Sequence, residues 1–196
     1  MQAKQVFSLY DWSGNRGTGS LNYCPRCGSK CSVKEAAGRE RPVCPECGFV
    51  HYANPLPGVD VLIERSGAVL LGRRAPGSIQ EGRWCLPCGF MEFDEDFLTA
   101  ARREVKEETG LEVVLRSILT VVTNYIAPDL HTLVVVFLAR PVGGTLRAGD
   151  DIDAVEWFPL AGPFPEMAFT GQRHIIERYD STRLKGAPVD PDLAVG

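Results

Sequence analysis

The sequence lacks any hydrophobic run long enough to cross a membrane. No segment approaches the ~20 consecutive apolar residues that a transmembrane helix needs. The first residues hold neither an apolar run of about seven residues nor a small-residue cleavage pattern, so we expect no secretory signal. These absences predict a soluble cytoplasmic protein without a membrane partner.

An excess of basic residues is also absent. The chain has 21 Lys and Arg against 25 Asp and Glu, with a net charge of −4 and a pI near 5.4. Nucleic acids and anionic lipid surfaces are bound by clustered Lys and Arg, so this composition argues against either as a general partner. An anionic substrate would need metal ions to mask its charge.

The cysteines do not fit a disulfide framework. Seven is an odd number, arranged as three C-x-x-C pairs plus one, which favours metal ligation in a reducing compartment. Cys24 and Cys27 form one pair and Cys44 and Cys47 another, the two pairs are separated by 16 residues, and a glycine follows each pair. Two such knuckles present four thiolates tetrahedrally to Zn²⁺ and leave no coordination position for a substrate. The pattern predicts a structural zinc ribbon, with a redox-active dithiol as the alternative.

Three cysteines remain outside this zinc pattern. Cys31 lies in the loop of the expected ribbon and is interpreted as a spare thiol. Cys85 and Cys88 form the third C-x-x-C in the segment RWCLPCG, and we interpret this pair as packing rather than as a second metal site.

The length and composition allow one sizeable core and one small satellite module. With 196 residues and 44% hydrophobic content, the chain is too short for two full domains. We expect a flexible arm over 1–20, the zinc ribbon over 21–53, the main domain over 54–184 and a frayed tail over 185–196. The two prolines of the NPLPG segment, 54–58, disfavour helix and strand pairing, so this segment is predicted to be a linker.

The main domain alternates strands and helices irregularly. The elements expected from residue pattern are a hairpin of strands over 59–65 and 68–74, a helix between an N-cap at Asp94 and Gly110, strands over 112–127, 131–140 and 154–158, and a helix over 170–186. Strands, a helix, more strands and a last helix predict an α+β or sandwich arrangement rather than regular βαβ winding.

The first expected helix has two stripes. They are an apolar stripe of Leu98, Ala101 and Val105 and an acidic stripe of Glu104, Glu107 and Glu108. Like charges at i and i+4 cost roughly 0.2–0.5 kcal/mol, and the C-terminal half of a helix favours cations. A solvated acidic face is one interpretation. The other is that bound cations relieve the repulsion.

This stretch resembles the signature of the Nudix hydrolases. It can be written G-x5-E-x7-R-E-V-x-E-E-x-G-L. The nine fixed residues over 23 positions are Gly89, Glu95, Arg103, Glu104, Val105, Glu107, Glu108, Gly110 and Leu111. The resemblance implies an α/β/α sandwich with a mixed sheet. It also implies divalent cations, usually Mg²⁺, held against the diphosphate of a nucleoside diphosphate joined to another group.

The resemblance also implies roles for single residues. Three carboxylates are the implied ligands of catalytic Mg²⁺ or Mn²⁺: Glu104, Glu107 and Glu108. Carboxylate oxygens are the ligands that Mg²⁺ prefers. The carbonyl of Gly89 is a further implied ligand, and Arg103 is expected to orient the carboxylates through paired hydrogen bonds. Glu95 either ligates a second ion or orients Arg103.

The general base is not fixed by the signature. Family members use either a glutamate of the helix or an acid on a later loop. The acids that precede and enter the strand over 154–158 are Asp150, Asp151, Asp153 and Glu156. We take Asp151 as the candidate. A plain polar loop that ends in a strand-surface glutamate is the alternative.

A zinc ribbon ahead of this signature resembles two groups of the family, the NADH pyrophosphatases and a shorter group of FAD and ADP-ribose pyrophosphatases. The SQPWPFP-type motif of the first group is absent, and the downstream run FPEMAFTGQRHIIERY resembles the second. We expect hydrolysis of the diphosphate linkage of FAD, ADP-ribose or an NADH-like molecule, with release of AMP and a phosphorylated product. A homodimer is common in the family.

The competing function is a non-enzymatic one. A Nudix fold can sense a nucleotide while a zinc ribbon contacts nucleic acid or protein. Sensor domains often lose acids of the signature, and this chain keeps all of them. The signature therefore favours the enzyme.

Overall fold

The computed structural model describes residues 21–127 and 130–189. They belong to two compact units. The larger contains Pro57–Val122 and the chain from Leu133 onward, and the smaller contains the described chain up to Leu56 together with Thr123–Thr132. The expected arm over 1–20 lies outside the described residues. No helix in the described chain is long and apolar enough to span a membrane.

The smaller unit contains a short hairpin and two cysteine knuckles. Strand β1, Ser32–Ala36, pairs antiparallel with β2, Arg39–Val43. The two turn residues between them, Ala37 and Gly38, have φ of 50° and 73°. Positive φ at both central residues is the geometry of a tight hairpin turn whose twist matches the flanking strands.

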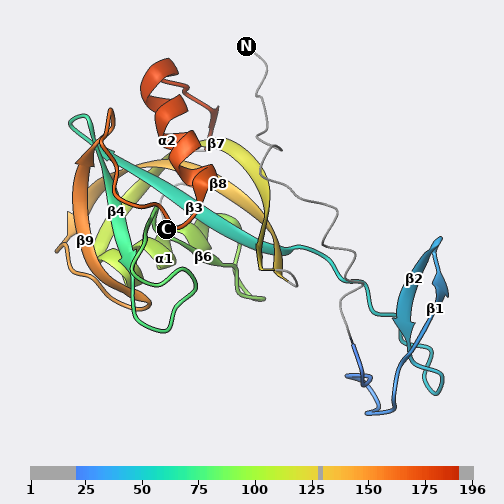
Figure 1. Ribbon diagram of the computed structural model, residues 1–196. Helices are drawn as coiled ribbons and strands as arrows, with labels where there is room; N and C mark the ends of the chain where they lie inside the picture. Colours follow the sequence, from blue (N-terminus) through green and yellow to red (C-terminus); the bar gives the residue numbers. More distant parts are fainter. Residues whose placement is uncertain (1–20, 128–129, 190–196) are drawn as a thin grey trace. The chain divides into compact units, whose positions relative to one another are not determined.

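The larger unit is built on one sheet, in which β10, β7, β8, β3, β4 and β5 follow one another, β6 also pairs with β3 and β9 also pairs with β4. Figure 1 labels β3, β4, β6, β7, β8 and β9 of this sheet. The strands are β3 (Leu56–Arg65), β4 (Ala68–Arg74), β5 (Trp84–Cys85), β6 (Cys88–Phe90), β7 (Leu111–Ala127), β8 (Leu130–Gly144), β9 (Ile152–Pro159) and β10 (Ala187–Pro188). The first long pair, β3 and β4, is the hairpin expected from sequence, with Glu64 opposite Val69.

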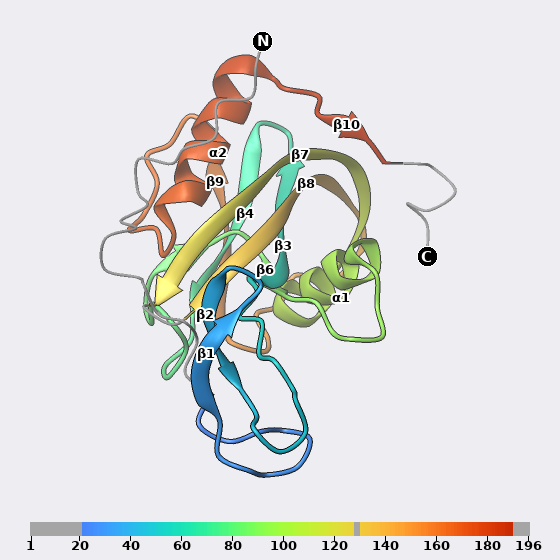
Figure 2. The same cartoon turned by 90° about the vertical axis from the view of Figure 1, so that its right-hand side faces the viewer.

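The sheet is covered by one helix on each face, α1 (Phe97–Thr109) and α2 (Thr170–Thr182). Successive side chains of a strand point to opposite faces. In β3, Val61 and Ile63 accordingly pack in the cluster that contains Ala101 of α1, whereas Leu62 packs in the cluster that contains Ile176 of α2. Figure 2 shows the two helices on opposite sides of the sheet. The expected α+β sandwich with a mixed sheet is confirmed.

The first helix begins two residues later than expected. The N-cap is Asp96, not Asp94, because the Asp96 carboxylate accepts hydrogen bonds from the backbone N–H groups of Leu98 and Thr99 at 2.7 and 3.0 Å. Its end is as predicted: Gly110 has φ of 70° and donates its N–H to the Lys106 carbonyl. The apolar stripe of this helix is buried.

Three other boundaries also differ from the expectations. Strand β3 begins at Leu56, inside the expected linker, and the Pro57 carbonyl accepts the Met91 N–H at 3.2 Å. Helix α2 ends at Thr182, four residues early, where Arg183 adopts a left-handed conformation. Part of the expected tail is strand β10, which pairs with β7; residues 190–196 lie outside the described chain.

Candidate active site and cysteine cluster

Strand β6 and helix α1 approach each other closely at the acidic stripe. Gly89 of β6 pairs with Val59 of β3, which fixes its position in the sheet. A Cβ atom on Gly89 would lie 2.2 Å from the carboxylate of Glu104. Only glycine leaves room for that carboxylate, which is 8% exposed. The signature glycine therefore forms one wall of the cradle that holds Glu104.

Arg103 connects three of the predicted acids. It forms a two-bonded pair with Glu95, with Nε to Oε2 at 3.0 Å and Nη2 to Oε1 at 2.6 Å. Its Nη1 donates to Glu104 at 2.8 Å and to Glu107 at 2.9 Å, and Nη2 also donates to the Phe90 carbonyl at 3.0 Å. The guanidinium thus has the geometry expected of an orienting residue, with Glu95 bonded to it.

Glu108 is the most deeply buried acid of the helix. It is 1% exposed, and its Oε2 accepts the backbone N–H of Cys88 at 3.0 Å. Its other oxygen, Oε1, is buried without a hydrogen-bond partner among the described residues. Burial raises the pKa of Glu108 well above its ordinary value, and the negative charge of Asp151 raises it further. This environment disfavours a bare carboxylate and suits one bound to a cation.

The loop before β9 is fixed against the C-terminal end of α1. Gly149 donates its N–H to the Glu108 carbonyl at 3.1 Å, and Arg147 donates to the Thr109 carbonyl at 2.9 Å. These bonds satisfy carbonyls that a helix end leaves without an intrahelical partner. They bring Asp151, which follows in the same loop, to the side of Glu108.

The predicted helix acids and two loop acids line one pocket of about 480 Å³. Its lining residues are Cys88, Gly89, Phe90, Glu92, Arg103, Glu104, Glu107, Glu108, Asp150 and Asp151. Two other candidate acids lie elsewhere: Asp153 pairs with Arg73 at 2.7 Å, and Glu156 stands opposite Leu71 in the β4–β9 ladder. The structure thus separates Asp150 and Asp151 from the rest of the loop cluster.

Sequence reasoning missed Arg74 and the backbone of Cys88. Arg74 is 7% exposed and its Nη2 lies 2.8 Å from Asp151 Oδ2, while Asp151 Oδ1 is buried without a partner in the described chain. An arginine at the end of the otherwise apolar run AVLLGRR was the available signal, because a buried charge needs a partner. Nothing in the sequence paired it with an acid of a later strand.

The donor set fits a hard divalent cation. Glu108 Oε1 and Asp151 Oδ1 are two buried carboxylate oxygens that lack donors among the described residues, and both side chains line the same pocket. The Glu108 oxygen suits Mg²⁺ or Mn²⁺, and the Asp151 oxygen in the same pocket suits a proton acceptor. The ligand oxygens are not gathered at one point, because Glu104 and Glu107 bond to Arg103 while Glu108 bonds to Cys88.

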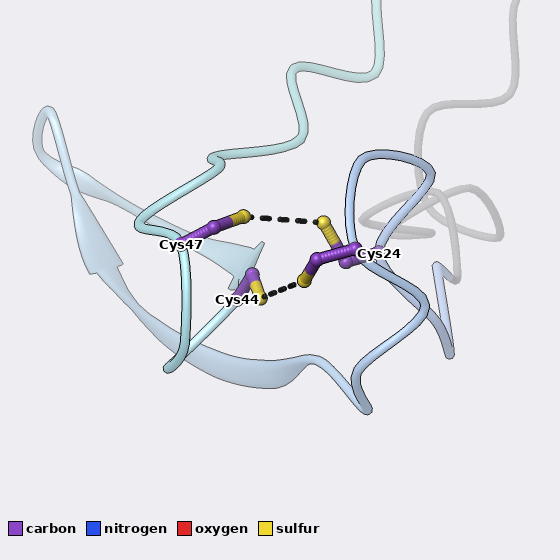
Figure 3. Close-up of side chains that lie close together, drawn as sticks. Cys24, Cys44 and Cys47 are labelled. Carbon is purple, nitrogen blue, oxygen red and sulfur yellow. Dashed lines mark hydrogen bonds between the residues drawn. The ribbon is translucent and has the colours of Figure 1, made fainter.

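The smaller unit brings the four predicted zinc cysteines together, and Figure 3 shows Cys24, Cys44 and Cys47 of this group side by side. Their sulfur atoms all lie within 4.8 Å of one another, with Cys24 and Cys47 at 3.5 Å and Cys27 and Cys44 at 3.4 Å. Zn–S bonds of about 2.3 Å in a tetrahedron imply sulfur–sulfur edges of about 3.8 Å, so the cluster is close to the required size. The donor set fits Zn²⁺.

The other three cysteines stay outside such a cluster. Cys31 is not part of the group of four, and Cys85 and Cys88 join no group of metal ligands in the described residues. Cys85 is fully buried and packs with Ile152 and Ala168. Cys85 thus has the placement of a packing residue, whereas Cys88 also lines the acidic pocket.

A buried acid beside the pocket leads to a prediction about stability. Asp60 of β3 lies opposite Cys88 of β6 and is 6% exposed. Burial raises its pKa from 3.8 to about 7, although a hydrogen bond with Gln172 lowers it in part. The neutral carboxyl group of Asp60 makes its full contribution to the free energy of unfolding below about pH 4. This contribution is lost as the pH rises through about 7.

Replacing Asp60 with Asn should therefore stabilise the protein increasingly as the pH rises from 5 to 8. The amide cannot ionise, and the removed cost is on the order of 4 kcal/mol for a shift of this size. Denaturant unfolding of both proteins across this pH range measures the gain. Asp153→Asn, at an exposed ion pair, is the control and should follow the parent. If the free energy of unfolding changed with pH in the same way for Asp60→Asn and the parent, the raised pKa of Asp60 would be contradicted.

A sheet between two helices and a carboxylate-lined pocket at the signature helix define the class of this protein as a hydrolase. In this class a small cysteine module precedes the catalytic fold. The chain belongs to the Nudix family: the family model described as NUDIX domain matches residues 54–179. A second model, described as Nudix N-terminal and named as a zinc ribbon, matches residues 22–53. The protein is a Nudix hydrolase with an N-terminal zinc-ribbon module.

Relatives with known names share both parts or the larger one. An ADP-ribose pyrophosphatase of Methanocaldococcus jannaschii is 38% identical over 132 residues, which cover 65% of this chain and 75% of that protein. A protein of Pseudomonas aeruginosa named NAD-capped RNA hydrolase NudC is 33% identical over 174 residues, 86% of this chain. The chain spans only 59% of the length of that relative.

Solved structures agree with the fold. The crystal structure of a NUDIX hydrolase from Nitrosomonas europaea superposes with a TM-score of 0.71 at 29% identity and covers 86% of this chain and 96% of its own. A MutT NUDIX hydrolase from Burkholderia pseudomallei has a TM-score of 0.56 at 30% identity and covers 63% of this chain and 97% of its own. The match to the Nitrosomonas europaea structure covers more of this chain than the larger unit contains.

Proposed function

We propose that the protein hydrolyses the diphosphate linkage of an ADP-ribose-like nucleoside diphosphate derivative and releases AMP and a phosphorylated product. The observation that carries this proposal is a pair of buried carboxylate oxygens, on Glu108 and Asp151, that have no donor in the described part of the chain and belong to side chains lining one pocket at the signature helix. Two such oxygens would be costly to keep in a fold without a function for them.

Several residues of the chain have distinct proposed roles in the reaction. Glu104, Glu107 and Glu108 would hold Mg²⁺ or Mn²⁺, with the Gly89 carbonyl as a further ligand. Held by these residues, such a cation would offset the negative charge of the diphosphate and make a water a better nucleophile. Arg103 and Glu95 position the carboxylates.

The proton of the attacking water needs an acceptor in the same pocket. Asp151 is the proposed general base, because its Oδ1 has no partner among the described residues while its Oδ2 is anchored by Arg74 at 2.8 Å. An anchored side chain with one unbonded oxygen can accept a proton without first giving up another bond.

The named relatives support ADP-ribose as the proposed substrate. The archaeal relative named as an ADP-ribose pyrophosphatase is 38% identical, against 33% for the relative named after NAD-capped RNA. The chain also lacks the SQPWPFP-type motif. We therefore place ADP-ribose ahead of FAD and NADH-like molecules. The homodimer, the cytoplasmic location and the domain limits of 21–53 and 54–184 stay predictions.

A substrate panel tests the proposal. Purified protein is incubated with ADP-ribose, FAD, NADH, diadenosine polyphosphates and dNTPs in Mg²⁺ and then in Mn²⁺, and AMP and phosphate products are measured. Preferred release of AMP from ADP-ribose is the expected result. No turnover with either cation would overturn the hydrolase proposal and favour a nucleotide sensor, which binding assays on the same panel would then reveal.

The positioning role of Arg103 gives a separate prediction. Arg103→Lys should lower kcat/KM for ADP-ribose by about 10–100-fold, because an ammonium group cannot reproduce the two-bonded pair with Glu95 while also reaching Glu104 and Glu107. Steady-state kinetics measure the loss. Arg173→Lys, at an exposed pair with Glu177 on α2, is the matched control and should keep parental rates. Equal rates for the two variants would exclude the positioning role.

A further inference from the structure

The larger unit contains a second pocket, of about 590 Å³, that shares no lining residue with the acidic pocket. It is formed by β3, β7 and β8, the C-terminal part of α2 and the segment that enters β10. Its lining residues are Glu64, Arg116, Ser117, Leu138, Ala139, Arg140, Tyr179, Lys185, Gly186 and Pro188. Small-molecule sites in proteins have volumes of roughly 300–1,000 Å³, so this pocket has the size of a ligand site.

The charge of this pocket is opposite to that of the protein. Three cationic side chains, Arg116, Arg140 and Lys185, line it against one carboxylate, Glu64. None of the three forms an ion pair within the described residues. The carboxylate is already engaged, because Glu64 Oε1 accepts the N–H of Gly67 at 2.8 Å. The pocket therefore has a local excess of positive charge, which attracts anions.

A buried hydroxyl without a partner lies in the same pocket. Ser117 is 3% exposed, and its Oγ is buried with no hydrogen-bond partner among the described residues. A buried hydroxyl without a partner costs free energy, so its retention calls for an explanation. An acceptor atom supplied by a ligand would satisfy it.

The wall that faces Ser117 is held in place by backbone contacts. Strand β10 pairs with β7 so that Pro188 lies opposite Ser117. Gly186 has φ of 69°, and a Cβ there would lie 2.3 Å from the Ile118 carbonyl and 3.1 Å from Ser117 Oγ. A glycine at this position lets Lys185 approach β7 closely. The three cations are exposed side chains, and the pairing of β10 with β7 fixes the backbone just after Lys185.

We propose that this pocket binds the phosphate group of a small molecule, at a second ligand site separate from the acidic pocket. Guanidinium groups and hydroxyls donate to phosphate oxygens, and the side chain of Tyr179 gives the same pocket an apolar ring surface for the rest of the ligand. The ligand would supply the acceptor that Ser117 lacks. Binding at this site would stabilise the fold without any contact with the hydrolytic residues.

Phosphate binding is tested on the full chain in a Mg²⁺-free buffer without chelator, so that zinc is retained. Inorganic phosphate and ribose 5-phosphate are titrated while backbone amide resonances are recorded. The expected result is saturable shifts at Ser117, Arg140 and Gly186, with little change at Gly89 and Glu107. Shifts confined to the acidic pocket would overturn the proposal. So would shifts that do not saturate and that chloride reproduces, which mean an adventitious ion only.

Substitutions of the cationic side chains and of the Ser117 hydroxyl distinguish phosphate binding in the pocket from attraction by general surface charge. Arg116→Glu and Lys185→Glu should each weaken phosphate binding at least about tenfold and leave ADP-ribose hydrolysis at the parental rate. Arg173→Glu makes the same change of charge on the exposed surface of α2 and should bind phosphate like the parent. Ser117→Ala should also weaken binding without loss of thermal stability. Unchanged affinity in all three pocket variants would refute the site.

The C-terminal segment of the chain is an alternative ligand for this pocket, in competition with phosphate. Two aspartates, Asp190 and Asp192, follow Pro188 closely in the sequence. A chain shortened after Val189 tests them. The proposal expects similar phosphate affinity in the full and the shortened chain. Binding by the shortened chain alone would mean that the C-terminal segment occupies the pocket, and the small-molecule proposal would be wrong.

Discussion

Glu108→Gln should lower kcat/KM for ADP-ribose by about 10³-fold or more, with the fold intact. The amide keeps the bond from the Cys88 N–H, because its oxygen can accept as Glu108 Oε2 does at 3.0 Å. It cannot supply the negative oxygen that a hard cation prefers, and cation contacts of this kind contribute several kcal/mol to the transition state. Each 1.36 kcal/mol lost is a factor of ten in rate.

The same substitution should change stability in the opposite direction from activity. Burial raises the pKa of Glu108, so the carboxylate destabilises the Mg²⁺-free fold once the pH rises above the ordinary glutamate value. Without Mg²⁺, Glu108→Gln should melt at or above the parental temperature near neutral pH, and added Mg²⁺ should raise its Tm less than it raises the parent's. If Glu108 had only a structural role, Glu108→Gln would melt at a lower temperature than the parent both with and without Mg²⁺.

Glu112→Gln is the matched control. Glu112 follows the signature on β7 and is exposed, where it pairs with Lys106 at 2.9 Å outside the acidic pocket. It should keep parental turnover and the parental Mg²⁺ response. If Glu108→Gln retained near-parental kcat/KM, the metal assignment at Glu108 would be wrong; if Glu112→Gln lost as much activity, the effect would be one of general charge.

The helix and its end were predictable because they depend on local sequence. Leu98, Ala101 and Val105 repeat at helical spacing, and Gly110 is suited to the left-handed end that the structure shows. The N-cap was misplaced by two residues because both Asp94 and Asp96 are good caps. Only the direction of the chain entering the helix selects the residue whose carboxylate reaches the free N–H groups.

The different environments of the acidic stripe were not predictable from spacing alone. Glu107 and Glu108 are neighbours in the signature, yet Glu108 is 1% exposed and the side chain of Glu107 is 48% exposed. The difference comes from strand β6, whose Cys88 N–H reaches Glu108 across the sheet edge. The pairing of Arg74 with Asp151 likewise depends on β9 lying beside β4, and no local pattern encodes that contact.

Loss of one zinc cysteine should unfold the smaller unit's ribbon. Between residues 21 and 53 the buried residues are Cys24, Pro42 and Cys44, so this module has almost no hydrophobic core. A two-stranded hairpin of five-residue strands is marginal by itself, and structural zinc contributes about 10–16 kcal/mol in small modules. Cys44→Ser should reduce zinc from one per chain to near none, as metal analysis measures, and trypsin should then cut rapidly at Lys34 and Arg39.

Cys31→Ser supplies the matched control for this prediction. Cys31 lies in the same module but outside the group of four sulfurs, so its replacement should leave one zinc per chain and slow cleavage. The larger unit has two hydrophobic clusters of its own, so its melting transition should persist in Cys44→Ser. Full zinc retention in Cys44→Ser would refute the four-cysteine site. Zinc loss in Cys31→Ser would instead make Cys31 a ligand, because a spare thiol at that position has no other route to the metal.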